Sequence, residues 1–475
     1  MVDQRPPTDI ITQTLEAIYD KRPILRELAN GRTTIEHFAT AAQWNPKPGD
    51  FPNRGMLEEV ILDETQRLYG TEVLRAISEH FSKSWTVETG AHAHIPRSFD
   101  RASKREGPQL NPLIFQGQVF WALTNRSIGS NINISLSSGR VPPDNLNSGS
   151  YIDLPSGRTA IKTVSTKKYS ETPQVLIPST GEEFIGQKVE QLNTLLGQGQ
   201  ISEEDYGLAK DILNNFRNHP DGFSDQVVTS HALVMNRVLR MSGIRQVTLD
   251  SERVASQFIG KVLAESNSSI VSRILSDPNL SKKFIKEFAG IDTGWQEGES
   301  PFYGISSKNG AGRLEANYSG STKPDDLTEA LASVRVLPKG VFKFFVFMTE
   351  AGVCPVGGMN QSGYCTEIRN RASKFLKEIG EAKRAEILSQ MPTNTAVISP
   401  CWGINSQSQE PSLVDPMSAA VEPLTPEEIS RIGSISSTDS LVIASPSLYT
   451  FLVGNKSPVG YAHLLDLKSN VAVVR

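Results

Sequence analysis

A strand that passes directly into a capped helix near the middle of the chain constrains the fold most. Residues 244–250, IRQVTLD, form a short run rich in apolar and β-branched residues. Residues 252–266, ERVASQFIGKVLAES, then carry apolar residues at helical spacing. Ser251 between the two is a residue type that caps helices, so it is the predicted N-cap. This succession of strand, cap and helix is typical of α/β folds.

Further apolar runs that end in small residues extend this pattern. The alternating run around residues 132–136 predicts a strand followed by a long polar loop. Strands are also predicted from other apolar runs, at 84–88, 173–181, 340–352, 395–403 and 440–454. Helical patterns stand between them, at 363–380 and 424–433. The predicted fold class is α/β and Rossmann-like, a mostly parallel sheet with helices on both faces, plus a helical accessory region.

The length of 475 residues exceeds what one hydrophobic core usually supports, so two domains or one domain with a large insertion are expected. Four regions follow from the pattern: an N-terminal helical segment, a first part of the α/β core, a helical insertion or subdomain, and the remainder of the core. Their predicted bounds are 1–83, 84–181, 182–243 and 244–475. Two helix starts carry capping signatures, at Ser202 and at Thr425.

Composition excludes several functional classes. No segment has the uninterrupted apolar length that a membrane span needs, and the N-terminal residues lack the apolar core of a secretory signal. The net charge of -4 provides no field that favours nucleic acid. Three cysteines are too few for a disulfide framework and are expected to be reduced thiols. We therefore expect a cytoplasmic protein with a small-molecule substrate and neither a membrane nor a nucleic-acid partner. The sequence leaves open whether the chain forms a homo-oligomer.

Two histidines one residue apart follow the predicted strand at 84–88. In an extended chain His92 and His94 point to the same side, so both side chains could reach one metal ion. A metal site of this kind needs further ligands at other strand ends, and the chain has only seven histidines. We therefore prefer catalytic acid/base chemistry or substrate binding without metal, with plain surface histidines as the alternative.

A glycine-rich segment at 352–363 precedes a predicted helix. Its glycines allow tight turns, and free N–H groups at a helix start suit a phosphate or a carboxylate. Neither a Walker loop nor a dinucleotide-binding glycine motif occurs, so the cofactor stays open, with a nucleotide as one option. Loops at the carboxyl ends of parallel strands carry ligand sites, and the residues proposed to bind substrate lie in or near such loops. They are Thr89, Gly90, Asn111, Arg140, Gly357, Gly358, Asn360, Gln361 and Tyr364.

Three segments together resemble the cysteine-adding enzymes of bacillithiol biosynthesis: VETGAHAHIP, SPFYGI and LPKGVFKFFVFMTEAGVCPVGGMNQSGYCTEI. Thr89 and Gly90 match the start of that family's T-G-Q-Q motif, although Ala91 and His92 stand in place of the glutamines. The family's later motif of glycines followed by a tyrosine before a helix is matched by Gly357, Gly358 and Tyr364. The resemblance implies a Rossmann-like core with a helical accessory part, a nucleotide or sugar-like ligand, and amide-bond formation.

The preferred hypothesis is a cytoplasmic enzyme that acts on a small, polar, anionic metabolite as a ligase or group transferase. In it His92 or His94 serves as acid/base, and the glycine loop holds an anionic group. Two alternatives remain. One is a metal-dependent hydrolase that uses both histidines, and the other is a non-catalytic binding or assembly protein whose helical block at 182–243 contacts a partner.

Overall fold

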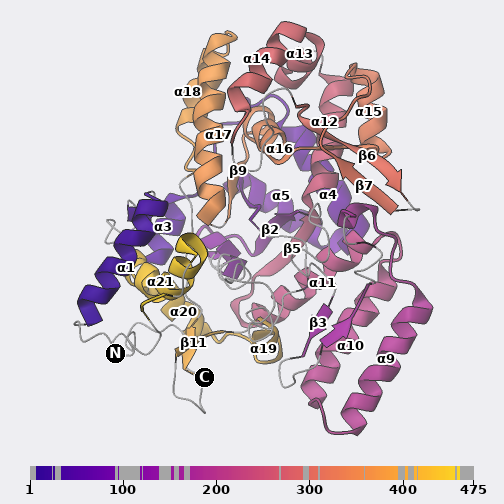
Figure 1. Ribbon diagram of the computed structural model, residues 1–475, viewed down its shortest axis with the longest axis vertical. Coiled ribbons are helices and arrows are strands. Elements are labelled where there is room, and N and C mark those ends of the chain that lie inside the picture. The colour runs from indigo at the N-terminus through magenta and orange to yellow at the C-terminus, as the bar shows by residue number, and fades with distance from the viewer. Residues whose placement is uncertain are drawn as a thin grey trace.

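The computed structural model is an assembly of helices around a small central sheet (Figure 1). The structure describes residues 7–23, 25–26, 34–90, 95, 118–119, 121–122, 124–138, 151–154, 160–164, 169, 172–266, 269–291, 299–308, 311–357, 359–393, 402–404, 411–414, 416–454 and 457–459. Among these residues, no helix combines the length and the apolar character that crossing a membrane requires.

The central sheet has four strands, all parallel. In chain order they are β1 (Thr86–Glu88), β2 (Ile132–Ser137), β5 (Arg245–Asp250) and β9 (Cys354–Val356). Their order across the sheet is β5-β2-β1-β9. The chain therefore builds the sheet outward from β1 in one direction and then returns to add β9 on the other side of β1. This order and the flanking helices confirm the predicted α/β, Rossmann-like class.

The helices that cover the sheet contact its strands from both sides. They include α4 (Arg54–Tyr69), α5 (Leu74–Lys83), α11 (Phe223–Val238) and α12 (Ser251–Glu265). Helix α11 packs along β5, α5 contacts β2, and α12 contacts both β2 and β5. The N-cap of α12 is Asp250, so the prediction of Ser251 is wrong by one residue. The reason is geometric, because the Asp250 carboxylate accepts hydrogen bonds from the backbone N–H groups of Glu252 and Arg253.

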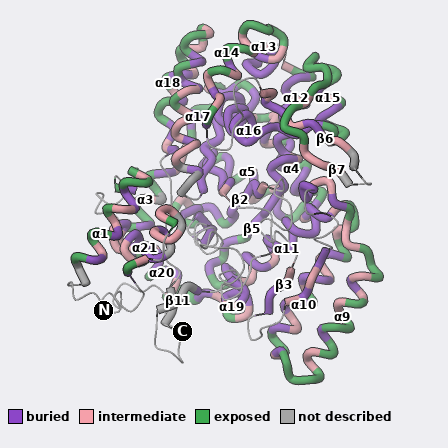
Figure 2. Tube along the Cα trace, viewed as in Figure 1, coloured by how far each residue is buried: buried purple, intermediate pink, exposed green. Residues whose placement is uncertain are grey.

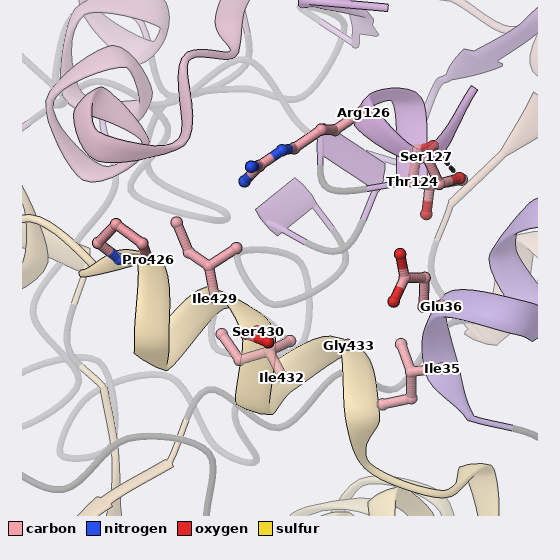
Figure 3. A pocket seen from close by; sticks show the side chains of 10 residues that line it. All are labelled: Ile35, Glu36, Thr124, Arg126, Ser127, Pro426, Ile429, Ser430, Ile432 and Gly433. Atoms are coloured by element: carbon pink, nitrogen blue, oxygen red, sulfur yellow. Dashed lines mark hydrogen bonds between the residues drawn. The ribbon is translucent and has the colours of Figure 1, made fainter. Parts of the chain in front are cut away.

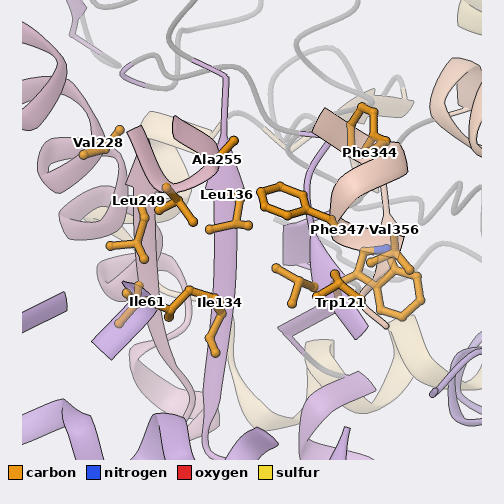
Figure 4. Packing of buried hydrophobic residues seen from close by; sticks show 14 of the residues in the cluster. Ile61, Trp121, Ile134, Leu136, Val228, Leu249, Ala255, Phe344, Phe347 and Val356 are labelled. Atoms are coloured by element: carbon orange, nitrogen blue, oxygen red, sulfur yellow. The ribbon is translucent and has the colours of Figure 1, made fainter. Parts of the chain in front are cut away.

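One apolar face of the sheet lies in the main hydrophobic core. Ile134, Leu136 and Leu249 point into a cluster that also contains Ile61 of α4 and Ala255 of α12 (Figure 4). The cluster draws its members from positions 35 to 435, so the N-terminal helices α4 and α5 share one core with the strands. Figure 2 shows that the buried residues gather around the sheet, while the outer helices carry the exposed ones.

The helical accessory region is confirmed as helical. It consists of α9 (Glu182–Gly197), α10 (Glu203–Asn218) and α11, and α10 contacts both of the others. Ser202 caps α10 as predicted, since its hydroxyl accepts a hydrogen bond from the Asp205 N–H at 3.1 Å. Helix α9 lies at the margin of the molecule, and much of its outer surface is exposed (Figures 1 and 2).

A second, antiparallel sheet of three strands lies beyond the central one. Its order is β7 (Ala311–Glu315), β6 (Phe302–Lys308) and β8 (Val336–Pro338). Helix α15 (Pro324–Ala332) contacts β8 of this sheet. Helix α13 (Ile270–Ser276) packs against α14 (Pro278–Phe288), and α17 (Met359–Glu378) packs against both α14 and α18 (Ala382–Ser389). The described residues also form two short antiparallel pairs, β3 (Tyr151–Asp153) with β4 (Ala160–Lys162) and β10 (Trp402–Ile404) with β11 (Pro411–Leu413).

Both ends of the described chain meet in a small helical layer. Helix α1 (Pro7–Lys21) packs against α21 (Ser437–Val453), and α3 (Ile35–Ala41) contacts α20 (Pro426–Ser434). Helix α19 (Pro416–Val421) instead contacts α10 and α11. The capping signature at Thr425 is confirmed, because its side chain accepts from the Glu428 N–H while the Glu428 carboxylate accepts from the Thr425 N–H.

Three apolar runs predicted as strands form no strand, and two of them are helical. The run at 340–352 forms α16 (Gly340–Val346) and a π-helical turn (Phe347–Ala351), the run at 440–454 lies in α21, and that at 173–181 contains only a short 3-10 helix (Gln174–Leu176). A continuous apolar run is buried on all sides in either conformation, so periodicity does not separate the two. Most of the run at 395–403 lies outside the described residues.

Candidate functional site

The point where the strand order reverses is the candidate ligand site. Residues after β1 continue toward β2 on one side, whereas β9 adds to the opposite side of β1. In open parallel sheets, such a reversal leaves a crevice beyond the carboxyl ends of the two strands, where ligands bind. In this chain the crevice would open between the residues that follow Glu88 and those that follow Val356.

Four sequence-predicted site residues lie together at this reversal. The Thr89 N–H donates to the Val356 carbonyl at 2.7 Å, which continues the pairing of β1 with β9. The Gln361 side-chain amide donates to the Thr89 hydroxyl. A Cβ atom on Gly357 would lie 2.6 Å from the Gly90 Cα and would collide with the Gln361 carboxamide. Glycine is therefore required at 357 because two backbone segments and one side chain occupy the space a side chain would need.

Of the other residues predicted from the sequence, two lie in α17 and the rest are not described by the structure. Tyr364 lies one turn further along α17, where its ring is 5.6 Å from that of Phe344 on α16. Asn360 lies in the first turn of α17, and its side chain is outside what the structure describes. The other predicted residues lie outside the described part of the chain; they are His92, His94, Asn111, Arg140 and Gly358.

One face of the central sheet carries buried polar side chains that extend to its carboxyl edge. Side chains at alternate positions of β2, namely Asn133, Ser135 and Ser137, are buried although they are polar. The Asn133 amide donates to Gln246 of β5 at 2.7 Å, and the Ser135 hydroxyl donates to the buried Glu88 carboxylate. These residues were missed from the sequence, although the repeated polar positions in NINISLS and RQVTLD are the signal that marks them.

A buried ion pair stands at the carboxyl end of β5. The Lys343 ammonium of α16 lies 2.8 Å from the Glu252 carboxylate and donates to the Ser251 hydroxyl at 2.7 Å. The Ser138 hydroxyl, just after β2, donates to the same carboxylate at 3.1 Å. Since Lys343 contacts the end of β5 and its neighbour Phe344 contacts Tyr364, α16 connects the ends of two strands along this edge.

Asp250 is a second buried acid at this edge. It accepts hydrogen bonds from the Ser224 hydroxyl of α11 and from two backbone N–H groups of α12. Burial raises the pKa of its carboxyl, and the nearby Glu252 carboxylate raises that pKa further. The edge therefore brings the Lys343 ammonium together with two buried carboxyl groups, those of Glu252 and Asp250.

The described cysteines are unsuited to nucleophilic chemistry. Cys354 in β9 and Cys365 in α17 are fully buried free thiols, and burial raises the pKa of both. The thiolate form that would attack a substrate is therefore disfavoured. Within the ranges that the structure describes, no group of three or more metal-binding side chains comes together. His92 and His94 are outside the described residues, so this finding does not apply to them.

Strand order, helical cover and the reversal at β1 define a Rossmann-like α/β protein with a candidate ligand site at the carboxyl edge of its sheet. Comparison with protein-family models, curated proteins and solved structures finds no match to the chain. Fold class therefore rests on topology, and function has to be argued from the site itself.

Proposed function

We propose that this chain is a cytoplasmic enzyme that binds a small, polar, anionic metabolite at the carboxyl edge of its central sheet. The observation that supports it is the reversal of strand order between β1 and β9, where the Gly90 and Gly357 backbones come into close contact. An α/β sheet binds its ligands at such a point because the loops that follow the two strands diverge.

The charge of the ligand follows from the segment after β9. Helix α17 begins two residues after Gly357, so its first N–H groups start at the reversal. Free N–H groups and the positive end of the helix dipole favour a phosphate or a carboxylate. Gln361 has a positioning role in this proposal, since its amide ties the start of α17 to Thr89.

The proposed reaction is group transfer or ligation, with His92 or His94 as acid/base. Support comes from the place of both histidines in the chain, directly after the end of β1, and from the resemblance in motif order to cysteine-adding enzymes. A nucleotide is the cofactor that the resemblance implies. The second candidate is a metal-dependent hydrolase, which the spacing of the two histidines favours.

A ligand screen tests the proposed site. Purified protein is heated with phosphorylated sugars, nucleotides, amino acids and carboxylates, and a ligand at a hundred times its Kd should add about 2.7 kcal/mol to the free energy of unfolding. Hydrogen exchange with the best ligand should then slow within residues 86–90 and 354–364. Protection confined to other segments, or no stabilising anion in the screen, would contradict the proposal.

Metal analysis separates the two candidate reactions. Protein purified without a histidine tag is expected to hold no stoichiometric transition metal. A stoichiometric metal that is lost in the double variant His92→Ala, His94→Ala would replace the group-transfer proposal with the hydrolase.

A further inference from the structure

A cavity of about 340 Å³ lies away from the reversal of strand order (Figure 3). Residues 124–127 at one of its sides precede β2, so this side belongs to the amino end of that strand rather than its carboxyl end. The cavity is lined from three parts of the chain that are far apart in sequence: α3, residues 124–127 and α20. Its lining residues are Ile35, Glu36, Thr124, Arg126, Ser127, Pro426, Ile429, Ser430, Ile432 and Gly433.

The walls of the cavity divide into an apolar and a charged part. Ile35, Ile429 and Ile432 are buried and provide an aliphatic surface. Arg126 and Glu36 are exposed and come from different elements, and Figure 3 shows the guanidinium extended over the cavity and the carboxylate turned into it. One cation and one anion therefore share a cavity with an aliphatic wall.

Within the described part of the chain, neither of these two charges has a charged partner. Among the described residues, no ion pair or side-chain hydrogen bond engages the Arg126 guanidinium or the Glu36 carboxylate. Ser127 is different, since its hydroxyl donates to the Thr124 carbonyl at 2.7 Å and lies 2.9 Å from the Thr40 hydroxyl. That contact ties α3 to the segment before β2, so the two elements that carry the charges are held in place.

We propose that this cavity binds a free α-amino acid with an aliphatic side chain. Arg126 would hold the carboxylate with two parallel N–H groups, Glu36 would accept from the ammonium group, and the side chain would contact the isoleucines. The volume lies at the low end of the range of about 300–1,000 Å³ for small-molecule sites, which fits a ligand of this size. This site is independent of the one proposed at the carboxyl edge.

Calorimetric titration of the full chain with L-leucine tests the proposal. We expect saturable binding that weakens at least about tenfold in Arg126→Gln and in Glu36→Gln, because each variant removes one charge-assisted interaction. Two analogues assign the roles. L-leucinamide lacks the carboxylate, so it should bind the wild-type protein weakly. The Arg126→Gln substitution should not weaken its binding further. N-acetyl-L-leucine lacks the ammonium group, so Glu36→Gln should not weaken it further.

The control variant is Arg75→Gln, which removes an exposed arginine from the surface of α5 and should bind L-leucine as wild type does. Both cavity variants should keep the wild-type melting temperature without ligand, since the substituted side chains have no partner among the described residues. The proposal is overturned if L-leucine, L-isoleucine and L-valine all fail to bind at millimolar concentration. It is also overturned if Arg126→Gln and Glu36→Gln bind L-leucine as tightly as wild type.

Discussion

Gly90 and Gly357 stand so close at the ends of β1 and β9 that a Cβ atom on Gly357 would lie 2.6 Å from the Gly90 Cα. Two segments distant in the chain thus meet backbone to backbone at the reversal of strand order. The Gln361 carboxamide packs against the same spot and donates to Thr89, so the contact is supported from α17 as well.

Gly357→Ala should therefore destabilise the protein by about 2 kcal/mol or more, because backbone cannot move aside as a flexible side chain can. Denaturant unfolding measures the effect. The control is Gly363→Ala in α17, where a Cβ atom meets nothing within 4 Å. That variant should stabilise by about 0.5–1 kcal/mol, since alanine favours helix over glycine. Equal stability of Gly357→Ala and wild type would contradict the close contact.

Acid should destabilise the protein through His80. Burial lowers the pKa of this histidine to about 4, and its ring nitrogens contact the Ser130 hydroxyl and the Thr86 carbonyl. The unfolded chain binds the proton near pH 6.5, about the ordinary histidine pKa, whereas the folded protein does not until about pH 4. The free energy of unfolding should thus fall as pH falls through this window, by at most about 3 kcal/mol.

Urea unfolding at several pH values measures this slope. His80→Gln should flatten this slope between about pH 6.5 and pH 4. An unchanged slope in His80→Gln would show that the ring does not remain neutral in the folded protein.

Lys343→Met should lower the free energy of unfolding by about 3–5 kcal/mol, because it leaves the Glu252 carboxylate buried without its cation. The double variant Lys343→Met, Glu252→Gln should recover part of that loss, since neither charge is then buried. Thermal unfolding of both variants supplies the comparison, with the exposed pair Arg75–Glu79 as control, where Arg75→Gln should have little effect. A double variant less stable than Lys343→Met would argue against this account.

Thiol reagents should not reach Cys354 or Cys365 in the folded protein. Both side chains are buried, and burial raises the pKa of both thiols. A Cys401→Ser background leaves only these two of the three cysteines in the chain. Reaction with an aromatic disulfide reagent is expected only after denaturant is added. Rapid reaction of either thiol in the native protein would contradict the burial.

Local pattern predicted several of the helices and the two longer strands of the central sheet. Apolar residues at helical spacing identified α9, α10 and α11, and alternation identified β2. Glycines near 357 pointed to the start of a helix, and α17 begins at Met359, soon after β9 ends at Val356. By contrast, β9 has only three residues, and the apolar run before it is helical rather than the predicted strand.

The sequence predicted individual residues of the candidate site but not that they come together. Thr89, Gly90, Gly357 and Gln361 stand out in sequence because they follow apolar runs, but nothing local shows that the two pairs meet. The polar positions of β2 and β5 could equally have faced water. They are buried because helices cover this face, and Asn125 and Ser224 reach from it to Asn133 and Asp250.

The sequence by itself determined the capped starts of α10 and α20, the alternation of apolar and polar residues in β2 and β5, and the glycines that come before α17. Those properties depend on neighbours a few residues apart along the chain. Only the tertiary structure decided that β9 pairs with β1, that a polar face of the sheet is buried, and that Arg126 and Glu36 line one cavity. Such contacts join distant segments, so they depend on how whole elements pack.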